Sequence, residues 1–251
     1  MPGPAVTNKM PRSISLLAFA LTLIGGGCWP AAAKAQTADR PNVLFIFLDD
    51  FGWRDTSYMG SDFYETPHLD KLAAQGMVFT DAYSCAANCA PARACLLSGQ
   101  YTPRHEVFNV GTGPRGHAKH RRLMHGPGTK TLDPKIRTWA HQLQTAGYAT
   151  ATMGKWHLSG GGDGKAEFEP TAQGFDINIG GCGFGGPPTF FDPYRIPHLP
   201  PRKKGEYLPE RLADEAIAFI GENKKQAKPF FLCLWNYTVH WPMEAPKDLI
   251  D

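Results

Sequence analysis

Residues 42–48 (NVLFIFL) form a nearly continuous apolar run that ends at the adjacent carboxylates Asp49 and Asp50. A strand with one solvent-exposed face alternates apolar and polar residues. This continuous apolar run therefore predicts a strand buried on both faces, as in parallel sheets. Similar runs lie at residues 148–154 (YATATMG) and 228–237 (KPFFLCLWNY), with helical patterns between them. The alternation of strands and helices predicts an α/β fold with a mainly parallel sheet.

The helical patterns are bounded by residues that start and stop helices. Residues 66–76 (TPHLDKLAAQG) have a threonine cap, a proline in the first turn and a terminal glycine. We expect a helix there with Leu69, Leu72 and Ala73 facing inward, followed by a short strand at residues 77–83 (MVFTDAY). Further helices are expected from Pro91 to Gly99, before Gly147 and at residues 210–226.

The N-terminus has the features of an export signal. Lys9 and Arg12 precede an apolar segment at residues 13–27 that is short for a membrane span, and an A-x-A site ends at Ala35. We therefore expect residues 1–35 to be a signal peptide and the mature chain to be periplasmic or secreted. A membrane anchor and a lipoprotein modified at Cys28 are the weaker alternatives.

Charge and cysteine content exclude several classes of protein. The net charge of +3 is too small to indicate binding to nucleic acid, and we expect no stable membrane insertion. Five cysteines follow the predicted signal peptide, which is too few and an odd number for a disulfide scaffold. These cysteines are Cys85, Cys89, Cys95, Cys182 and Cys233.

Polar residues follow three of the predicted strands. Ligands bind beyond the carboxyl ends of strands in parallel sheets, so the Asp49–Asp50 pair, Lys155, His157 and His240 should share one site. The two carboxylates suit Ca²⁺ or Mg²⁺, or form an ordinary acidic turn. Lys155 and His157 would point to the same side of an extended segment and suit an anionic substrate and proton transfer, unless the lysine is merely solvated.

Cys89 lies close to the start of a predicted helix, where anions and thiolates are favoured. Arg93, one turn further on, would add positive potential. A zinc site is excluded because the cysteines lack CxxC spacing and a nearby fourth ligand. A cysteine–histidine hydrolase and a disulfide among Cys85, Cys89 and Cys95 both remain open.

Five motifs, in order along the chain, resemble the sulfatase family. CAPARACLLSG (residues 89–99) is similar to the family signature Cys-x-Pro-x-Arg followed by Leu-x-Ser/Thr-Gly. The other four are RPNVLFIFLDDFGWRD, TPHLDKLAAQGMVFTDAYS, AGYATATMGKWHL and KPFFLCLWNYTVHWPMEAP. The resemblance covers residues 40–246, and its order and spacing are far more specific than CxPxR alone.

The resemblance implies an alkaline-phosphatase-like three-layer sandwich with a mainly parallel central sheet. It implies that Cys89 is oxidised to formylglycine by a separate maturation enzyme, and that Asp49, Asp50 and modified Cys89 bind a divalent cation, usually Ca²⁺. A hydrated aldehyde has two hydroxyls, so one can attack sulfur and the other can drive release of sulfate. The substrate would be a sulfated small molecule or glycan.

The resemblance also implies roles for four further residues. Arg93 would hold the hydrate oxygens and offset their charge, and Lys155 would bind the sulfate. His157 would take a proton from the hydrate, and His240 would contact the sulfate or the leaving oxygen.

The chain departs from the family pattern at two places. Ala92 stands where the family usually has serine, and no Asp-Asn metal pair or second sulfate-binding lysine follows His240. We therefore expect residues 36–251 to be the N-terminal part of the catalytic domain. A phosphatase or phosphodiesterase of the same fold, which commonly has Thr or Ser in place of Cys89, and an inactive sulfatase-like protein are the alternatives. The basic residues 113–126 would face an anionic sugar chain or form a solvated loop.

Overall fold

The computed structural model describes residues 40–111, 113, 116–124, 126–160 and 165–250. The predicted signal peptide and its cleavage site lie outside this part of the chain. Among the described residues, no helix is both long enough and apolar enough to cross a membrane.

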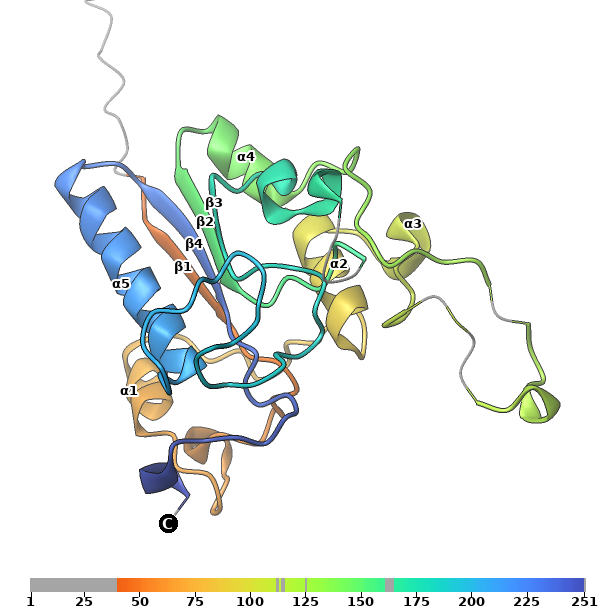
Figure 1. The fold of residues 1–251 in the computed structure, drawn as a ribbon, viewed down its shortest axis with the longest axis horizontal. Coiled ribbons are helices and arrows are strands. Elements are labelled where there is room, and N and C mark those ends of the chain that lie inside the picture. The colour runs from red at the N-terminus through yellow and green to blue at the C-terminus, as the bar shows by residue number, and fades with distance from the viewer. Residues whose placement is uncertain (1–39, 112, 114–115, 125, 161–164, 251) are drawn as a thin grey trace, which may run out of the picture. The chain divides into compact units, whose positions relative to one another are not determined.

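A parallel sheet of four strands lies at the centre of the described fold (Figure 1). Its strands, in spatial order, are β1 (Val43–Phe47), β4 (Phe230–Trp235), β2 (Ala149–Gly154) and β3 (Ile177–Ile179). All three pairings are parallel, which confirms the predicted sheet. The prediction that β1 is buried on both faces is wrong: Leu44 and Ile46 are each 47% exposed, because helix α5 (Leu208–Lys225) packs mainly on β4 and β2 and leaves that side of the edge strand β1 open. The sequence did not reveal β3, because it is only three residues long and has a polar residue at its centre.

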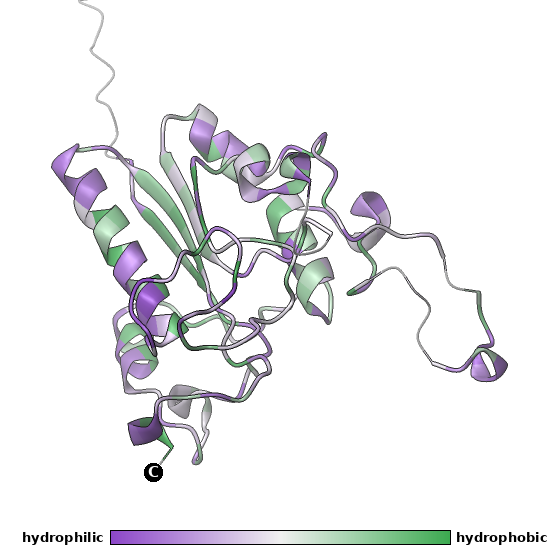
Figure 2. Ribbon diagram, in the orientation of Figure 1, coloured by the Kyte–Doolittle hydropathy of each residue, from purple (hydrophilic) through white to green (hydrophobic). Residues whose placement is uncertain are grey.

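The central strand β4 supplies alternate residues to two hydrophobic cores. Phe230 and Leu232 face a core that is closed by helix α5 (Leu208–Lys225), while Phe231 and Trp235 face a second core on the opposite side. Side chains alternate across a strand, so one buried strand can serve both cores. Figure 2 shows apolar strands beside a largely hydrophilic α5. Burying one such large side chain stabilises the fold by about 1.5–3 kcal/mol.

Helices cover both faces of the sheet, which gives the predicted three layers. The second core is covered by α2 (Cys89–Ser98) and α4 (Trp139–Thr145), on the face away from α5 (Figure 1). Helix α2 was predicted to begin at Pro91, and in the structure it begins two residues earlier, at Cys89, with Asn88 as its N-cap. The remaining helices are α1 (Pro67–Gln75) and α3 (Thr102–His105), with 3₁₀ turns at Ser57–Met59, Ala118–His120, Ala166–Phe168, Pro170–Gln173 and Lys247–Leu249.

The region of α1 differs from the expectation in two ways. The helix forms as predicted, but none of its residues is buried and the side chain of Leu72, predicted to face inward, is 60% exposed. Residues 77–83 were predicted to be a strand, yet they form no strand in the structure. A strand requires a hydrogen-bonded neighbour, and the described sheet provides none for this segment.

The carboxyl ends of β1, β4 and β2 are tied together beyond the sheet. Asp49 N–H donates to the Thr238 carbonyl at 3.0 Å, and Val239 N–H donates to the Asp49 carbonyl at 2.8 Å. Lys155 N–H donates to the Trp235 carbonyl at 2.8 Å. These bonds hold the three segments that carry the predicted site residues beside one another.

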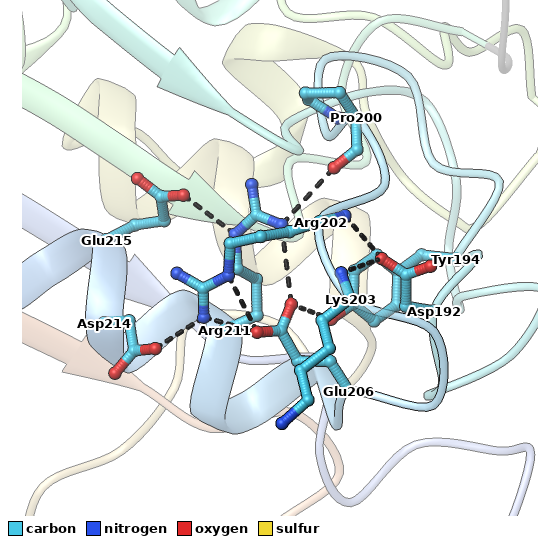
Figure 3. A network of polar contacts seen from close by, with 9 residues as sticks. All are labelled: Asp192, Tyr194, Pro200, Arg202, Lys203, Glu206, Arg211, Asp214 and Glu215. Atoms are coloured by element: carbon cyan, nitrogen blue, oxygen red, sulfur yellow. Dashed lines mark hydrogen bonds and ion pairs between the residues drawn. The ribbon is translucent and has the colours of Figure 1, made fainter.

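The long connection between β3 and α5 is held by a polar network (Figure 3). Arg202 contacts Glu206 and Asp214, while Arg211 Nε donates to Glu215 at 2.8 Å. Asp192 accepts hydrogen bonds from the backbone N–H groups of residues 202 and 203. The network fastens the connection to the first turns of α5 and so supports the loop that continues toward the site.

Candidate active site

Three charged residues form a buried cluster at the carboxyl edge of the sheet. Asp49 follows β1, Lys155 follows β2 and Arg93 lies on α2, and their side chains are 6%, 0% and 0% exposed. The Lys155 ammonium contacts Asp49 Oδ2, while Arg93 Nη2 lies 3.5 Å from Asp49 Oδ1. Burying a charge is unfavourable unless it is paired, so the single carboxylate stabilises both cations. With Arg93 and Lys155 both protonated, the cluster carries one excess positive charge.

Arg93 is held rigidly but keeps unused hydrogen-bonding capacity. Its Nη1 donates to the Lys155 carbonyl at 2.6 Å, and its guanidinium lies over the rings of Phe47 and Trp235 at 5.1 and 4.9 Å. Burial lowers the pKa of Arg93 to about 10, so the group stays charged at neutral pH. Its Nε has no hydrogen-bond partner among the described residues. A buried cation with a free donor is suited to an anionic ligand.

Lys155 and His157 lie in a strongly cationic environment. Burial lowers the pKa of Lys155 to about 7, although the Asp49 carboxylate opposes this shift. Burial, followed by the charges of Lys155, Arg93 and His240, lowers the pKa of His157 to about 3. The His157 ring is therefore neutral at neutral pH, and its Nδ1 has no partner among the described residues. A neutral imidazole in this position can accept a proton.

Cys89, Asp50 and His240 form a more open part of the site. One ligand atom each from Asp49, Cys89 and His240 can be chosen so that all lie within 4.8 Å of one another. Asp50 does not belong to this group, but its Oδ2 lies 3.9 Å from His240 Nε2. The structure therefore brings together two of the three predicted metal ligands and adds His240, which was predicted to contact the sulfate.

The Cys89 thiol does not behave as its helical position suggested. Burial, and then the charge of Asp50, raise the pKa of Cys89, and the nearby Arg93 only partly offsets this. The expected stabilisation of a thiolate at the helix N-terminus is thus outweighed by desolvation. This weakens the alternative of a cysteine–histidine hydrolase, which needs the thiolate as its nucleophile.

The other cysteines do not engage Cys89. The five cysteines of the described residues are free thiols, so the disulfide alternative is not realised in this structure. Cys85 is exposed, whereas Cys95 is buried with its Sγ 3.3 Å from His105 Nε2. Cys89 is left as the one half-buried thiol that faces the charged cluster.

Two glycines that the sequence reasoning missed lie against the histidines. A Cβ on Gly185 would fall 2.7 Å from His157 Cε1, and a Cβ on Gly186 would fall 2.7 Å from His240 Nδ1. Contacts this short do not occur between real side chains, so only glycine permits the observed packing. The glycine-rich stretch at residues 180–186 was the available signal for such a close approach.

A small cavity of about 200 Å³ opens beside His157 and the first turn of α2. Ala90 and His157 form one side, and Asn109, Gly111 and Lys130 form another. Larger hollows exist elsewhere, including one of about 820 Å³ along α1 and residues 76–84. None of the candidate site residues lines that hollow, whereas His157 and Ala90, the residue after Cys89, line the small cavity, which therefore lies next to the site.

The family of the chain follows from comparison with known proteins. Residues 41–251 match the model of the Sulfatase family, and the chain therefore belongs to the sulfatase family. It is 31% identical to the N-acetylgalactosamine-6-sulfatase of Mus musculus over 232 residues, which cover 84% of this chain and 42% of that protein. It is 40% identical to the N-acetylgalactosamine-6-O-sulfatase of Bacteroides thetaiotaomicron over 178 residues, which cover 68% of this chain and 32% of that protein.

Solved structures agree with this assignment. Ps i-CgsB in complex with k-i-k-neocarrahexaose matches with a TM-score of 0.65 and 25% identity, over 83% of this chain and 47% of that one. A second structure, in complex with its substrate D-glucosamine-2-N,6-O-disulfate, matches with a TM-score of 0.60 and 28% identity, over 80% of this chain and 35% of that one. The alkaline-phosphatase-like fold is thereby confirmed, and the phosphatase alternative is not favoured. The chain spans less than half the length of the curated relatives named here.

Proposed function

We propose that this chain takes part in hydrolysis of a sulfate ester, with the nucleophile at position 89. The observation that carries the proposal is the position of Cys89 in front of a buried cluster with excess positive charge, beside a neutral His157. A sulfuryl group carries negative charge throughout its transfer, and preorganised buried cations stabilise that charge more strongly than water does. The names of the sulfatase relatives support the same reaction.

The site residues would have different roles in the reaction. Arg93 and Lys155 would bind the sulfate and offset charge that builds on its oxygens. His157, which is neutral, would accept the proton of the attacking hydroxyl, and His240 would face the leaving oxygen from the open side. Because Arg93 and Lys155 are already fixed by Asp49 and by backbone contacts, little reorganisation is needed when the substrate binds.

The nucleophile would be formylglycine, made from Cys89 by a maturation enzyme. Among the cysteines of residues 85–95, only Cys89 has a proline two residues later and an arginine four residues later. The raised pKa of the Cys89 thiol also makes the unmodified residue a poor nucleophile. The hydrated aldehyde would supply one hydroxyl for attack and a second for release of sulfate.

A divalent cation, which we propose to be Ca²⁺, would be held at the open part of the site. Asp49 and Asp50 offer carboxylate oxygens, and modified Cys89 would offer oxygen in place of sulfur beside them. Bound there, a cation would stabilise negative charge on the nucleophile and on the sulfate. Ca²⁺ prefers six to eight oxygen ligands, and the described residues supply only some of them. We therefore expect the 251-residue chain alone to bind Ca²⁺ weakly and to turn over slowly.

The substrate would be a sulfated sugar, and the chain would meet it outside the cytoplasm. The named relatives and one complexed structure concern sulfated sugars. Export would follow from cleavage after Ala35. N-terminal sequencing of secreted protein checks this point, and a start elsewhere or a lipidated Cys28 would contradict it.

Mass spectrometry of the chain co-expressed with a formylglycine-generating enzyme tests the central proposal. We expect the peptide that contains Cys89 to carry the aldehyde, while Cys85 and Cys95 in the same digest stay alkylatable and serve as internal controls. Full alkylation of Cys89 would refute the formylglycine nucleophile.

A second variant tests the reaction itself. Cys89→Ser in a chain that binds substrate should react once and keep covalent sulfate, because one hydroxyl cannot drive elimination. Multiple turnovers by this variant would contradict the proposed mechanism.

A further inference from the structure

One segment of the chain is rich in basic residues and contains no acidic residue. Residues 107–132 contain five lysines and arginines, three histidines and no aspartate or glutamate. This stretch therefore carries a charge of +5, whereas the whole chain carries +3. A basic segment at this density attracts polyanions at a range of about 10 Å in ordinary salt.

The tip of this segment is folded so that its basic residues lie together. We name residues 116–122 the basic arm. A 3₁₀ turn at Ala118–His120 brings the rings of His117 and His120 to 6.1 Å, and Arg121 donates to the Gly116 carbonyl. Every residue of the arm is exposed, and Figure 1 shows the segment running out from the fold and back.

Both ends of the segment are fastened to the candidate active site. At one end, Asn88 Nδ2, directly before Cys89, donates to Asn109 Oδ1 at 2.8 Å. At the other end, Leu132 N–H donates to the carbonyl of Leu158, the residue after His157. The arm is thus attached to the two catalytic segments.

The same two ends line the cavity beside His157. Asn109 and Gly111 come from one end and Lys130 from the other, and Lys130 is exposed. The volume of about 200 Å³ is below the usual range for a pocket that encloses a drug-sized ligand. A sulfate and part of one sugar fill such a space, so the rest of a glycan must extend outside the cavity, where the exposed side chain of Lys130 can meet it.

We propose that Lys130 and the basic arm form a binding site for anionic groups that a glycan chain carries beyond the reacting sulfate. This inference rests on the proposed sulfate-ester hydrolysis and extends it to a polymeric, multiply charged substrate. Among the described residues, Lys130 is the one lysine or arginine that lines the cavity, and Lys119, Arg121 and Arg122 are exposed cations of the arm in the same segment. Ammonium and guanidinium groups match sulfate and carboxylate oxygens, which are the anionic groups of such chains.

The attachment of the arm favours a glycan over a lipid surface. Leu123 and Met124, beside the arm, are 86% and 98% exposed, so an anionic membrane is the competing partner. A membrane contact requires no link to the cavity, whereas both ends of this segment line it. The arrangement therefore points to one extended ligand that occupies the cavity and the arm together.

Charge removal on the arm tests the proposal. The triple variant Lys119→Ala, Arg121→Ala, Arg122→Ala is compared with the wild-type chain in titrations against a heparin octasaccharide. The matched control removes three lysines at the far end of α5 and just after it, on the opposite edge of the sheet: Lys224→Ala, Lys225→Ala, Lys228→Ala. We expect the arm variant to bind roughly tenfold more weakly and the control less than about twofold more weakly.

Salt and vesicles complete the binding test. Raising NaCl from about 50 to about 300 mM should weaken wild-type binding more steeply than binding by the arm variant. The variant has three fewer cations, so salt has fewer attractive interactions to screen. Equal losses in the arm variant and the control would overturn the proposal. Arm-dependent binding to phosphatidylserine vesicles without octasaccharide binding would also overturn it, in favour of a membrane.

Kinetics separate this inference from the proposed function. With matured protein that hydrolyses 4-nitrophenyl sulfate and a sulfated octasaccharide, the arm variant should lose at least about fivefold more kcat/KM on the octasaccharide. Equal losses on both substrates would overturn the inference alone. If mature wild-type protein hydrolyses no sulfate ester, the proposed function fails, while arm-dependent octasaccharide binding would still support the binding site.

Lys130→Ala tests the link between the cavity and the arm. Because Lys130 lines the cavity and is exposed, this variant should weaken octasaccharide binding, and Lys130→Arg should restore most of it. Unchanged binding by Lys130→Ala would remove Lys130 from the proposed site.

Discussion

The candidate active site has two halves that differ in how their charges are satisfied. The inner half consists of Asp49, Arg93 and Lys155, and the outer half consists of Asp50, Cys89 and His240. In the inner half no side chain is more than 6% exposed, and the two cations share one carboxylate of the protein as their counter-ion. In the outer half the side chains of Asp50 and His240 are 56% and 28% exposed, with 3.9 Å between Asp50 Oδ2 and His240 Nε2.

This difference indicates which residues are held in place before a ligand binds. Desolvated ions must be paired by the fold itself, so the inner half is part of the protein's stability. Exposed groups interact weakly with each other through water, so the outer half keeps its capacity for a cation and a substrate. The four predictions below test this division.

The largest effect is expected from Asp49→Asn. The substitution leaves the buried Arg93 and Lys155 without their shared counter-ion, and we expect a loss of about 3–5 kcal/mol in the free energy of unfolding. Urea denaturation of the purified chain measures it. The matched control is Asp50→Asn, which should change the unfolding free energy by less than about 0.5 kcal/mol. Equal effects of the two substitutions would abolish the distinction between the halves.

His157 should give the next largest effect, through pH. The folded protein keeps this ring neutral down to about pH 3, whereas the unfolded chain protonates it near its usual pKa of 6.5. Below pH 6.5 the unfolded state thus binds more protons, and the free energy of unfolding should fall by about 1.4 kcal/mol per pH unit until the folded pKa is reached.

Unfolding titrations between pH 4.5 and 7 check this prediction. His157→Gln should flatten the pH dependence, while the exposed His68→Gln should leave it unchanged. A steep decline that persists in His157→Gln would show that other groups cause it.

Gly185→Ala should have an intermediate effect. The added methyl would meet the His157 ring at 2.7 Å, so the loop or the ring must move, at about 1–3 kcal/mol of stability. Gly221→Ala on α5, where a Cβ meets nothing within 4 Å, is the control and should stabilise the chain by about 0.5–1 kcal/mol. Thermal unfolding of both variants checks this, and an unaffected Gly185→Ala would show that the loop yields easily.

Calcium should give the smallest effect, confined to the outer half. With incomplete coordination, Ca²⁺ at about 5 mM should stabilise the chain by no more than about 1 kcal/mol. Asp50→Asn should remove this gain, whereas Asp62→Asn, at another exposed aspartate, should keep it. A gain that survives Asp50→Asn would place the cation elsewhere.

The elements predicted most reliably from the sequence are those whose residue pattern depends on local structure alone. The apolar runs of β2 and β4 and the long amphipathic α5 formed as expected, because burial on a sheet or against it demands such patterns. The run of β1 also formed a strand, but only one of its faces is buried, contrary to the prediction. Residues 77–83 have an apolar composition that suits a strand, but composition cannot supply the neighbouring strand that must pair with it. Helix α1 shows the same limit, because its residue pattern predicted the helix but could not supply the neighbouring element that would bury Leu72.

For the site, the sequence indicated which side chains meet but not how deeply they lie. Strand ends placed Asp49 and Lys155 at one edge, yet their complete burial with Arg93 depends on β4 and on two aromatic rings. The close contacts of Gly185 and Gly186 with the histidines depend on a loop whose path no local pattern specifies.

The contact between Asp49 and Lys155 has a consequence for the order of folding. The two residues lie 106 positions apart and follow β1 and β2, which are separated in space by β4. In the described sheet both strands pair with β4, so the position of the contact depends on β4 lying between them. Contacts of such long range slow folding, because the intervening chain must be ordered before they form. A nascent chain would thus carry Arg93 and Lys155 as solvated ions, and the cationic pocket would form only once β1, β4 and β2 are paired.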